Sequence, residues 1–179
     1  GDEAGTAITT GDYNTALGYV AGDAITDSSR NTAVGAFSLT TNILGSRTVA
    51  VGFGALETMN PASSVDMYNV GVGYNAGQAV TTGIKNTFVG GLSGDSNTTA
   101  SNNTAVGYNS LNESTTGHSN AALGVNTLLL NTTGTQNTAL GMGALVFNTT
   151  AANNTAVGFN SLNANTTGTR NVAVGALTL

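Results

Sequence analysis

A five-residue motif recurs along the whole chain at a nearly constant interval. It reads Asn-Thr-Ala-Val-Gly in its commonest form, and successive copies start 17 residues apart except for one step of 21. The ten copies start at residues 14, 31, 48, 69, 86, 103, 120, 137, 154 and 171. A fixed period of this kind is the signature of a stacked repeat architecture. Residues 1–179 are therefore predicted to form a single repeat array. Because the array starts and stops within a unit, we expect it to be an excerpt of a longer fibre.

The unit is too short for a pair of helices, and it lacks helical periodicity. We number its places from the Asn of the motif, so that the motif fills places 1 to 5 and a frequent Thr-Thr-Gly fills places 13 to 15. Thr, Val, Asn and Gly favour short strands and turns. The sequence therefore predicts an all-β fold, a parallel β-solenoid (β-roll) of about ten 17-residue coils. Each coil is expected to contain a strand at the motif, a turn at its Gly, a second strand and a bend at Thr-Thr-Gly.

Stacking the coils in register predicts columns of equivalent side chains, about 4.8 Å apart. Place 1 is Asn in nine of its ten copies, which predicts a stack of amides hydrogen-bonded along the rod. Place 4 is always Val or Leu and place 3 is mostly Ala, so the strand is apolar on both faces. One face can line the interior, and the other is expected to pack against further copies in a closed, cyclic homo-oligomer. The residues predicted to pack between chains are the alanines Ala16, Ala33, Ala50, Ala105, Ala139, Ala156 and Ala173.

The composition excludes several classes of protein. Only 7% of the residues are charged, and the four cationic residues within a net charge of −5 argue against a nucleic-acid partner. No apolar run is long enough to span a membrane, and there is no Cys for disulfides or thiolate metal sites. His118 is the only His, and neither a nucleophile elbow nor a phosphate loop occurs. We therefore predict no catalytic residue, no cofactor and no metal ligand. An alternative is that Asn and Asp side chains hold an ion on the axis of the oligomer.

The irregular step between copies is a four-residue insertion within residues 57–68, which holds the only Pro. An insertion in one coil must bulge from the rod, and loops often carry function. One hypothesis is a contact point for a receptor or a neighbouring fibre; the alternative is a tolerated bulge. The residues of this possible contact loop are Met59, Asn60, Pro61, Ser63, Asp66 and Tyr68.

Charged residues also follow columns. All four cations stand at place 17, immediately before the motif: Arg30, Arg47, Lys85 and Arg170. Three acids share place 10: Asp23, Glu57 and Asp95. Either these two places face solvent, or the cations form a charged stripe for a ligand.

Three strings, NTAVGYNSLNESTTG, NTFVGGLSG and NTTGTQNTALG, resemble repeats of bacteriophage tail-fibre and bacterial surface-fibre proteins, which are similar to the heads of trimeric autotransporter adhesins. The adhesin heads use a shorter unit with more Ser. The resemblance implies an extracellular homotrimer, in a virion tail fibre or on a cell surface. It also implies a non-enzymatic structural segment that supports attachment, with a cell-surface glycan or protein bound by parts outside this chain.

Two other functions compete with this interpretation. Columns of Thr on a flat β-wall are also typical of an ice-binding solenoid, and a β-solenoid can also bind polysaccharide. A polysaccharide-degrading fibre needs paired carboxylates in a groove. The acidic residues here are scattered over several columns, with only Asp2 and Glu3 adjacent.

Overall fold

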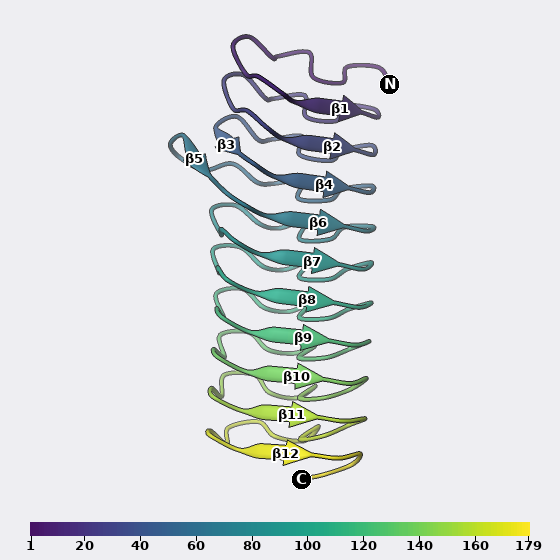
Figure 1. The fold of residues 1–179 in the computed structure, drawn as a ribbon, viewed down its shortest axis with the longest axis vertical. Helices are drawn as coiled ribbons and strands as arrows, with labels where there is room; N and C mark the ends of the chain where they lie inside the picture. The colour runs from purple at the N-terminus through teal and green to yellow at the C-terminus, as the bar shows by residue number, and fades with distance from the viewer.

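The computed structural model describes residues 1–179 as an all-β parallel solenoid without helices. Figure 1 shows a rod in which one strand of each coil joins a single parallel sheet. Its ten strands are β1 (Thr15–Leu17), β2 (Thr32–Val34), β4 (Val49–Val51), β6 (Val70–Val72), β7 (Thr87–Val89), β8 (Thr104–Val106), β9 (Ala121–Leu123), β10 (Thr138–Leu140), β11 (Thr155–Val157) and β12 (Val172–Val174). Two further strands, β3 (Gly45–Ser46) and β5 (Val65–Asp66), pair with each other.

The strands stack in the predicted register. Ala105 pairs with Ala122, and Ala139 pairs with Ala156, so equivalent places lie above one another. The register continues across the insertion, where Ala50 pairs with Gly71. The predicted parallel β-solenoid with a 17-residue repeat is confirmed, and its ten strands are joined by about nine turns.

The expected second strand of each coil is wrong. Places 7, 9 and 17 have left-handed backbone angles; in one regular coil Asn109, Leu111 and Ser119 have φ values of 53°, 55° and 60°. A strand needs extended residues with negative φ, so the chain bends at these places. It still bonds to its neighbours, because the Leu111 N–H donates to the Thr127 carbonyl and the Asn109 N–H donates to the Gly91 carbonyl.

Each strand is followed by the Gly at place 5. At this place consecutive coils lie too close together for a side chain. Gly90 has φ of +130°, and a Cβ there would lie 2.6 Å from the carbonyl oxygen of Gly107 in the next coil. That separation is smaller than any real contact, and L-residues rarely adopt this φ. The Gly of the motif is therefore a requirement of stacking.

The interior is filled by a few side chains that compensate for one another. Where place 9 is Leu, as at Leu111 and Leu145, that side chain is fully buried beneath the Ala column. Where place 9 is Gly, as at Gly22, the buried side chain of Ile25 at place 12 fills the space instead. Phe88 replaces the Ala of place 3 in one coil. Its ring is fully buried beside two place-9 glycines, Gly77 and Gly94, whose missing side chains leave room for it.

The Asn column of place 1 closes each coil and joins it to the next. The Asn137 Oδ1 accepts from the Asn154 N–H at 3.0 Å, while its Nδ2 donates to the Ala151 carbonyl of its own coil at 2.9 Å. The predicted amide stack is therefore present, but most of its bonds go to the backbone. Direct side-chain bonds occur only in some coils, for example from Asn137 Nδ2 to Asn120 Oδ1 at 3.3 Å.

Candidate functional site

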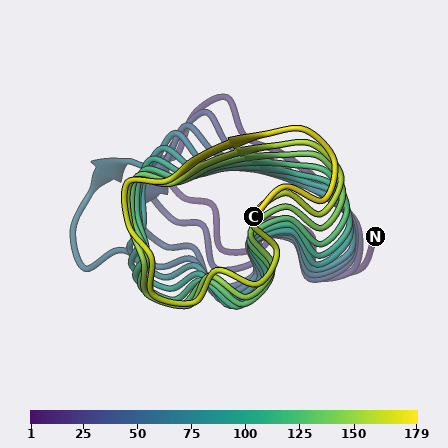
Figure 2. The same ribbon diagram turned by 90° about the horizontal axis from the view of Figure 1, so that it is seen from below.

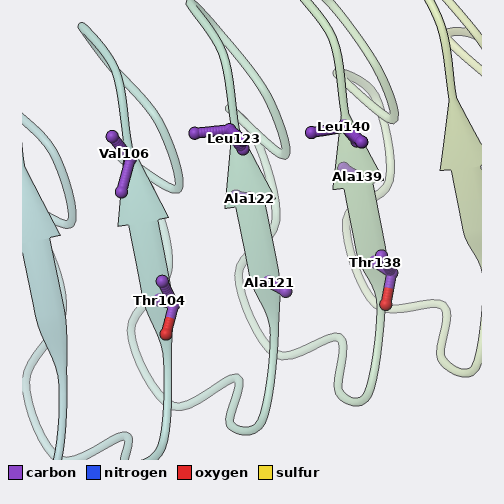
Figure 3. A pocket seen from close by; sticks show the side chains of 8 residues that line it. All are labelled: Thr104, Val106, Ala121, Ala122, Leu123, Thr138, Ala139 and Leu140. Atoms are coloured by element: carbon purple, nitrogen blue, oxygen red, sulfur yellow. The ribbon is translucent and has the colours of Figure 1, made fainter.

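The outward face of the ten-stranded sheet carries a row of apolar side chains. Residues alternate along each strand, so that place 3 points inward while places 2 and 4 point outward. Leu17, Leu123 and Val174 at place 4 are 59%, 48% and 69% exposed. Figure 3 shows Val106, Leu123 and Leu140 in a row on neighbouring strands, with Thr104, Ala121 and Thr138 at the other end of the same strands. A straight stripe of Val and Leu side chains thus runs along the rod.

A shallow depression of about 370 Å³ lies on this face, between β8 and β10. It is lined almost entirely by apolar atoms, and its bottom consists of small residues between the strands. Its lining residues are Thr104, Val106, Ala121, Ala122, Leu123, Thr138, Ala139 and Leu140. The depression offers no charged group to a ligand, so its chemistry suits another apolar surface.

The alanines predicted to pack between chains lie inside the coil. Ala33, Ala50, Ala105, Ala139, Ala156 and Ala173 are buried in a single chain, and Ala16 in the first coil is half-buried. They belong to the chain's own core, so the assignment of this column to inter-chain contacts is wrong. The exposed column is place 4. The sequence is compatible with this orientation: place 3 is Ala or Gly except at Phe88, whereas place 4 is always Val or Leu.

The insertion forms a bulge beside the rod, and only part of it is accessible. In Figure 2 the segment with β5 swings out from the stacked coils. Met59 and Pro61 are buried, so they cannot serve as contact residues, and this part of the predicted contact loop is wrong. Asn60, Ser63, Asp66 and Tyr68 are exposed.

Arg47 ties the bulge to the preceding coil. Its Nε lies 2.9 Å from an Asp66 carboxylate oxygen, and its guanidinium lies 5.6 Å from the centre of the Tyr68 ring. The β3–β5 pairing brings these residues together. The accessible part of the bulge is thus held in place by an exposed ion pair and a cation–π contact, which together are modest in energy.

The cation column of place 17 is exposed along its whole length, as expected for a solvent-facing place. Arg47 makes the only ion pair in the chain, while Arg30 lies 5.4 Å from the centre of the Tyr13 ring in the preceding coil. Tyr13 and Tyr68 share place 17 with the cations. The column therefore presents guanidinium, ammonium and aromatic groups at one edge of the sheet.

An aromatic ladder at the opposite edge of the sheet was missed by the sequence reasoning. The rings of Tyr19, Phe37, Phe53 and Tyr74 follow one another with centres 5.4 to 5.6 Å apart. They occupy place 6, or place 7 in the case of Phe37, so the 17-residue register could have found them. Tyr19, Phe53 and Tyr74 are about half exposed.

The titratable side chains form no cluster that could hold a metal ion. His118 is exposed, and its Nδ1 contacts only the Ser119 Oγ, at 3.2 Å. No three His, Cys, Asp or Glu side chains lie together. Asp95 is the one group with a perturbed environment: burial raises the pKa of its carboxyl, and the Glu113 charge adds to the effect. Its Oδ1 has no hydrogen-bond partner, and neither have the side-chain atoms of nearby Asn97.

One column of free Thr hydroxyls faces solvent. The second Thr of the Thr-Thr-Gly bend is exposed in six consecutive coils: Thr82, Thr99, Thr116, Thr133, Thr150 and Thr167. The first Thr is half-buried in all of these coils except the last. In four of them its hydroxyl donates to the next coil, as from Thr115 Oγ1 to the Thr132 carbonyl at 3.2 Å. The column has no regular Thr neighbour, because place 16 varies among Ile84, His118 and Ala152.

Comparisons with protein-family models, with curated proteins and with solved structures found no match to this chain. None of its segments folds into an apolar helix that could cross a membrane.

Proposed function

We propose that this chain is a non-enzymatic structural segment of a homotrimeric fibre, in a phage tail fibre or a cell-surface adhesin, and that the whole fibre attaches to a host or surface. The observation that carries the proposal is the outward face of the sheet. Its place-4 column is Val or Leu in every coil; four of these side chains are exposed and the other six are partly buried. An apolar stripe of this length on a lone rod would be an unusually large patch.

Three parallel rods can cover these faces together. If each sheet faces a common axis, the place-4 columns of the three chains meet there, and place-2 Thr side chains lie at their margin. Cyclic symmetry closes such an assembly without leaving an apolar face free. The in-register stacking keeps each column straight, so the contact can extend over all ten strands.

The oligomeric mass in solution tests this proposal. Light scattering should give about 53 kDa, three times the 17.7 kDa of one chain. Replacing Leu123 and Leu140 by Asp puts two charges into the proposed contact and should yield monomers, because unpaired buried charges are costly. The matched control, Thr133→Asp on an exposed face away from the sheet, should remain trimeric. A monomeric parent chain would contradict the proposal.

The exposed part of the insertion is the proposed contact point within such a fibre. Asn60, Ser63, Asp66 and Tyr68 are exposed, so a receptor or a neighbouring fibre can reach them. The segment that contains β5 lies outside the stacked coils (Figure 2). Replacing residues 57–68 by the corresponding stretch of a regular coil should weaken attachment of the full fibre while leaving its trimeric mass unchanged. Unaltered attachment would show that the bulge is merely tolerated.

A further inference from the structure

The cation column and the aromatic ladder lie at opposite edges of the same sheet. Place 17 comes immediately before the motif and place 6 immediately after it, and all ten strands run in the same direction (Figure 1). Each exposed ring is therefore separated from the cation edge by six residues of nearly extended chain, about 20 Å. Within one chain the two columns cannot contact each other.

When each coil is counted from its motif, cations nevertheless occur only in coils that carry an aromatic ring at place 6 or 7. The ring follows the strand of that coil, and the cation precedes the strand of the next coil. The four pairs are Arg30 with Tyr19, Arg47 with Phe37, Lys85 with Tyr74, and Arg170 with Phe159. The coil that ends in Tyr68 has Phe53. The coils with Gly91, Val125 and Met142 at place 6 end in uncharged residues, and Tyr108, whose coil ends in Ser119, is the only ring without a cation or a Tyr partner.

The cations have few reasons of their own to stand at place 17. Arg30, Lys85 and Arg170 have φ values of 62°, 59° and 60°, a backbone conformation that favours Gly or Asn. Asn occupies this place in only two coils, at Asn102 and Asn153. None of these three cations makes an ion pair in the chain. Arg30 contacts one ring of its own chain, that of Tyr13, whereas Lys85 and Arg170 contact neither an acid nor a ring within the chain. A partner for these two cations is therefore to be sought outside it.

We propose that the cations of one protomer pack on the aromatic rings of the adjacent protomer. This inference rests on the proposed parallel homotrimer. When three sheets face one axis, the starting edge of each sheet meets the ending edge of the next. A rotation about the rod axis does not change height, so a cation meets the ring of its own coil number within less than one coil spacing of about 4.8 Å. A cation over an aromatic face is attracted by the ring quadrupole.

We call the line along which the edges of two neighbouring sheets meet a corner of the trimer. The cation–ring contact at each corner would favour chains that run in the same direction. All cations lie on one edge and the aromatic ladder lies on the other, so parallel chains bring cations to the ladder, while antiparallel chains would bring like edges together. Four of the ring-bearing coils lie consecutively between residues 14 and 85, which makes this part of the rod the main corner contact. The free faces of Tyr19, Phe53 and Tyr74 are then covered by the neighbour.

Site-directed cross-linking of the full chain tests the corner contact. The sequence has no Cys, so the double variant Phe159→Cys/Arg170→Cys introduces the only thiols. A short bismaleimide cannot span the strand within one chain. It should join neighbouring protomers, and most of the protein should migrate as a covalent trimer on a denaturing gel. The single variants Phe159→Cys and Arg170→Cys are the controls and should remain monomeric on that gel, because equivalent residues lie at different corners.

The outcomes separate this inference from the trimer itself. A trimeric mass by light scattering without cross-linking in the double variant would overturn the corner pairing and leave the trimer standing. A monomeric mass would overturn both. Cross-linking in a single variant would indicate that like edges meet, which also contradicts the proposal.

A second measurement asks what the cations bind. Replacing Arg30, Lys85 and Arg170 by Gln should raise the concentration at which the trimer dissociates severalfold, and replacing Asp12, Asp27 and Glu113 by Asn or Gln should not. The cation variant could instead dissociate at the same concentration as the parent and lose its retention on a heparin column. That result would indicate that the cations bind an anionic polysaccharide, and the proposal would be wrong.

Discussion

Two sets of coils, residues 14–85 and residues 103–170, have the same backbone conformation. They differ in the side chains that fill the interior of the coil and in those that cover the edge of the sheet. In the first set, place 12 holds mostly apolar side chains such as Ile25, Met59 and Val80, and aromatic rings cover one edge. In the second set, place 12 holds Asn in most coils. Asn148 Nδ2 donates both to Asn131 Oδ1 and to the Ala151 carbonyl, each at 3.0 Å.

The second set therefore has two parallel amide columns that share one row of carbonyl groups. Asn137 and Asn148 both donate to the Ala151 carbonyl. In the first set the place-1 column is interrupted at Thr48, and the Asn69 N–H receives no side-chain acceptor from it. The comparison shows that place 12 accepts either an apolar side chain or a hydrogen-bonded Asn. The condition is that the interior is filled and that every buried amide has a hydrogen-bond partner.

The coil between the two sets, residues 86–102, offers the largest test of this comparison. Phe88→Ala should lower the free energy of unfolding by about 3–5 kcal/mol, because Gly77 and Gly94 leave no other side chain to fill the space. Chemical denaturation measures the loss. Phe53→Ala, at an exposed ring, is the control and should cost much less.

A rescue variant makes the same test more specific. Phe88→Ala/Gly94→Leu restores the Ala and Leu of a regular coil, and it should recover much of the lost stability. Failure to recover would contradict the compensation between places 3 and 9.

The amide column predicts the next largest effect. Asn137→Ala leaves the Asn154 N–H without its partner and removes a bond to the Ala151 carbonyl. Leaving buried polar groups unsatisfied should cost about 2–4 kcal/mol in total. Thr48→Ala, at the natural interruption of the same column, should cost distinctly less in the same denaturation experiment. Equal losses at the two positions would show that the column adds nothing beyond packing.

Asp95 predicts the smallest effect, and its sign depends on pH. Because burial, with Glu113, raises the pKa of its carboxyl above 3.8, the folded state binds the proton more tightly than the unfolded state does. This contribution to stability is present below pH 3.8 and is lost as the pH rises through the folded-state pKa. Asp95→Asn should therefore raise the melting temperature modestly at neutral pH, and its advantage should shrink on acidification.

The control for Asp95 is Asp23 at the same place of another coil. The Asp23 carboxylate accepts a hydrogen bond from the Thr6 hydroxyl at 2.5 Å, which Asp95 lacks. Asp23→Asn should bring no gain at neutral pH. An equal gain in both variants would point to the overall negative charge of the chain instead of the burial of Asp95.

The sequence by itself determined the period, the parallel register, the stack of Asn side chains and the place of the insertion. These follow from the repeat alone, because in-register stacking puts every residue beside its equivalent 17 residues away. It also showed that both faces of the motif strand are apolar. It could not show which face is inside, since Ala at place 3 and Val or Leu at place 4 both suit a core.

The tertiary structure decided the orientation of the strand. Left-handed residues at places 7 and 9 fold the chain back toward the sheet, so that side chains such as Leu111 already occupy the narrow interior. Only a methyl group fits above them, except where glycines make room for Phe88. Ala therefore points inward, and Val or Leu points outward to the surface available to a partner. This orientation depends on the width of the coil interior, which cannot be deduced from the sequence of one strand.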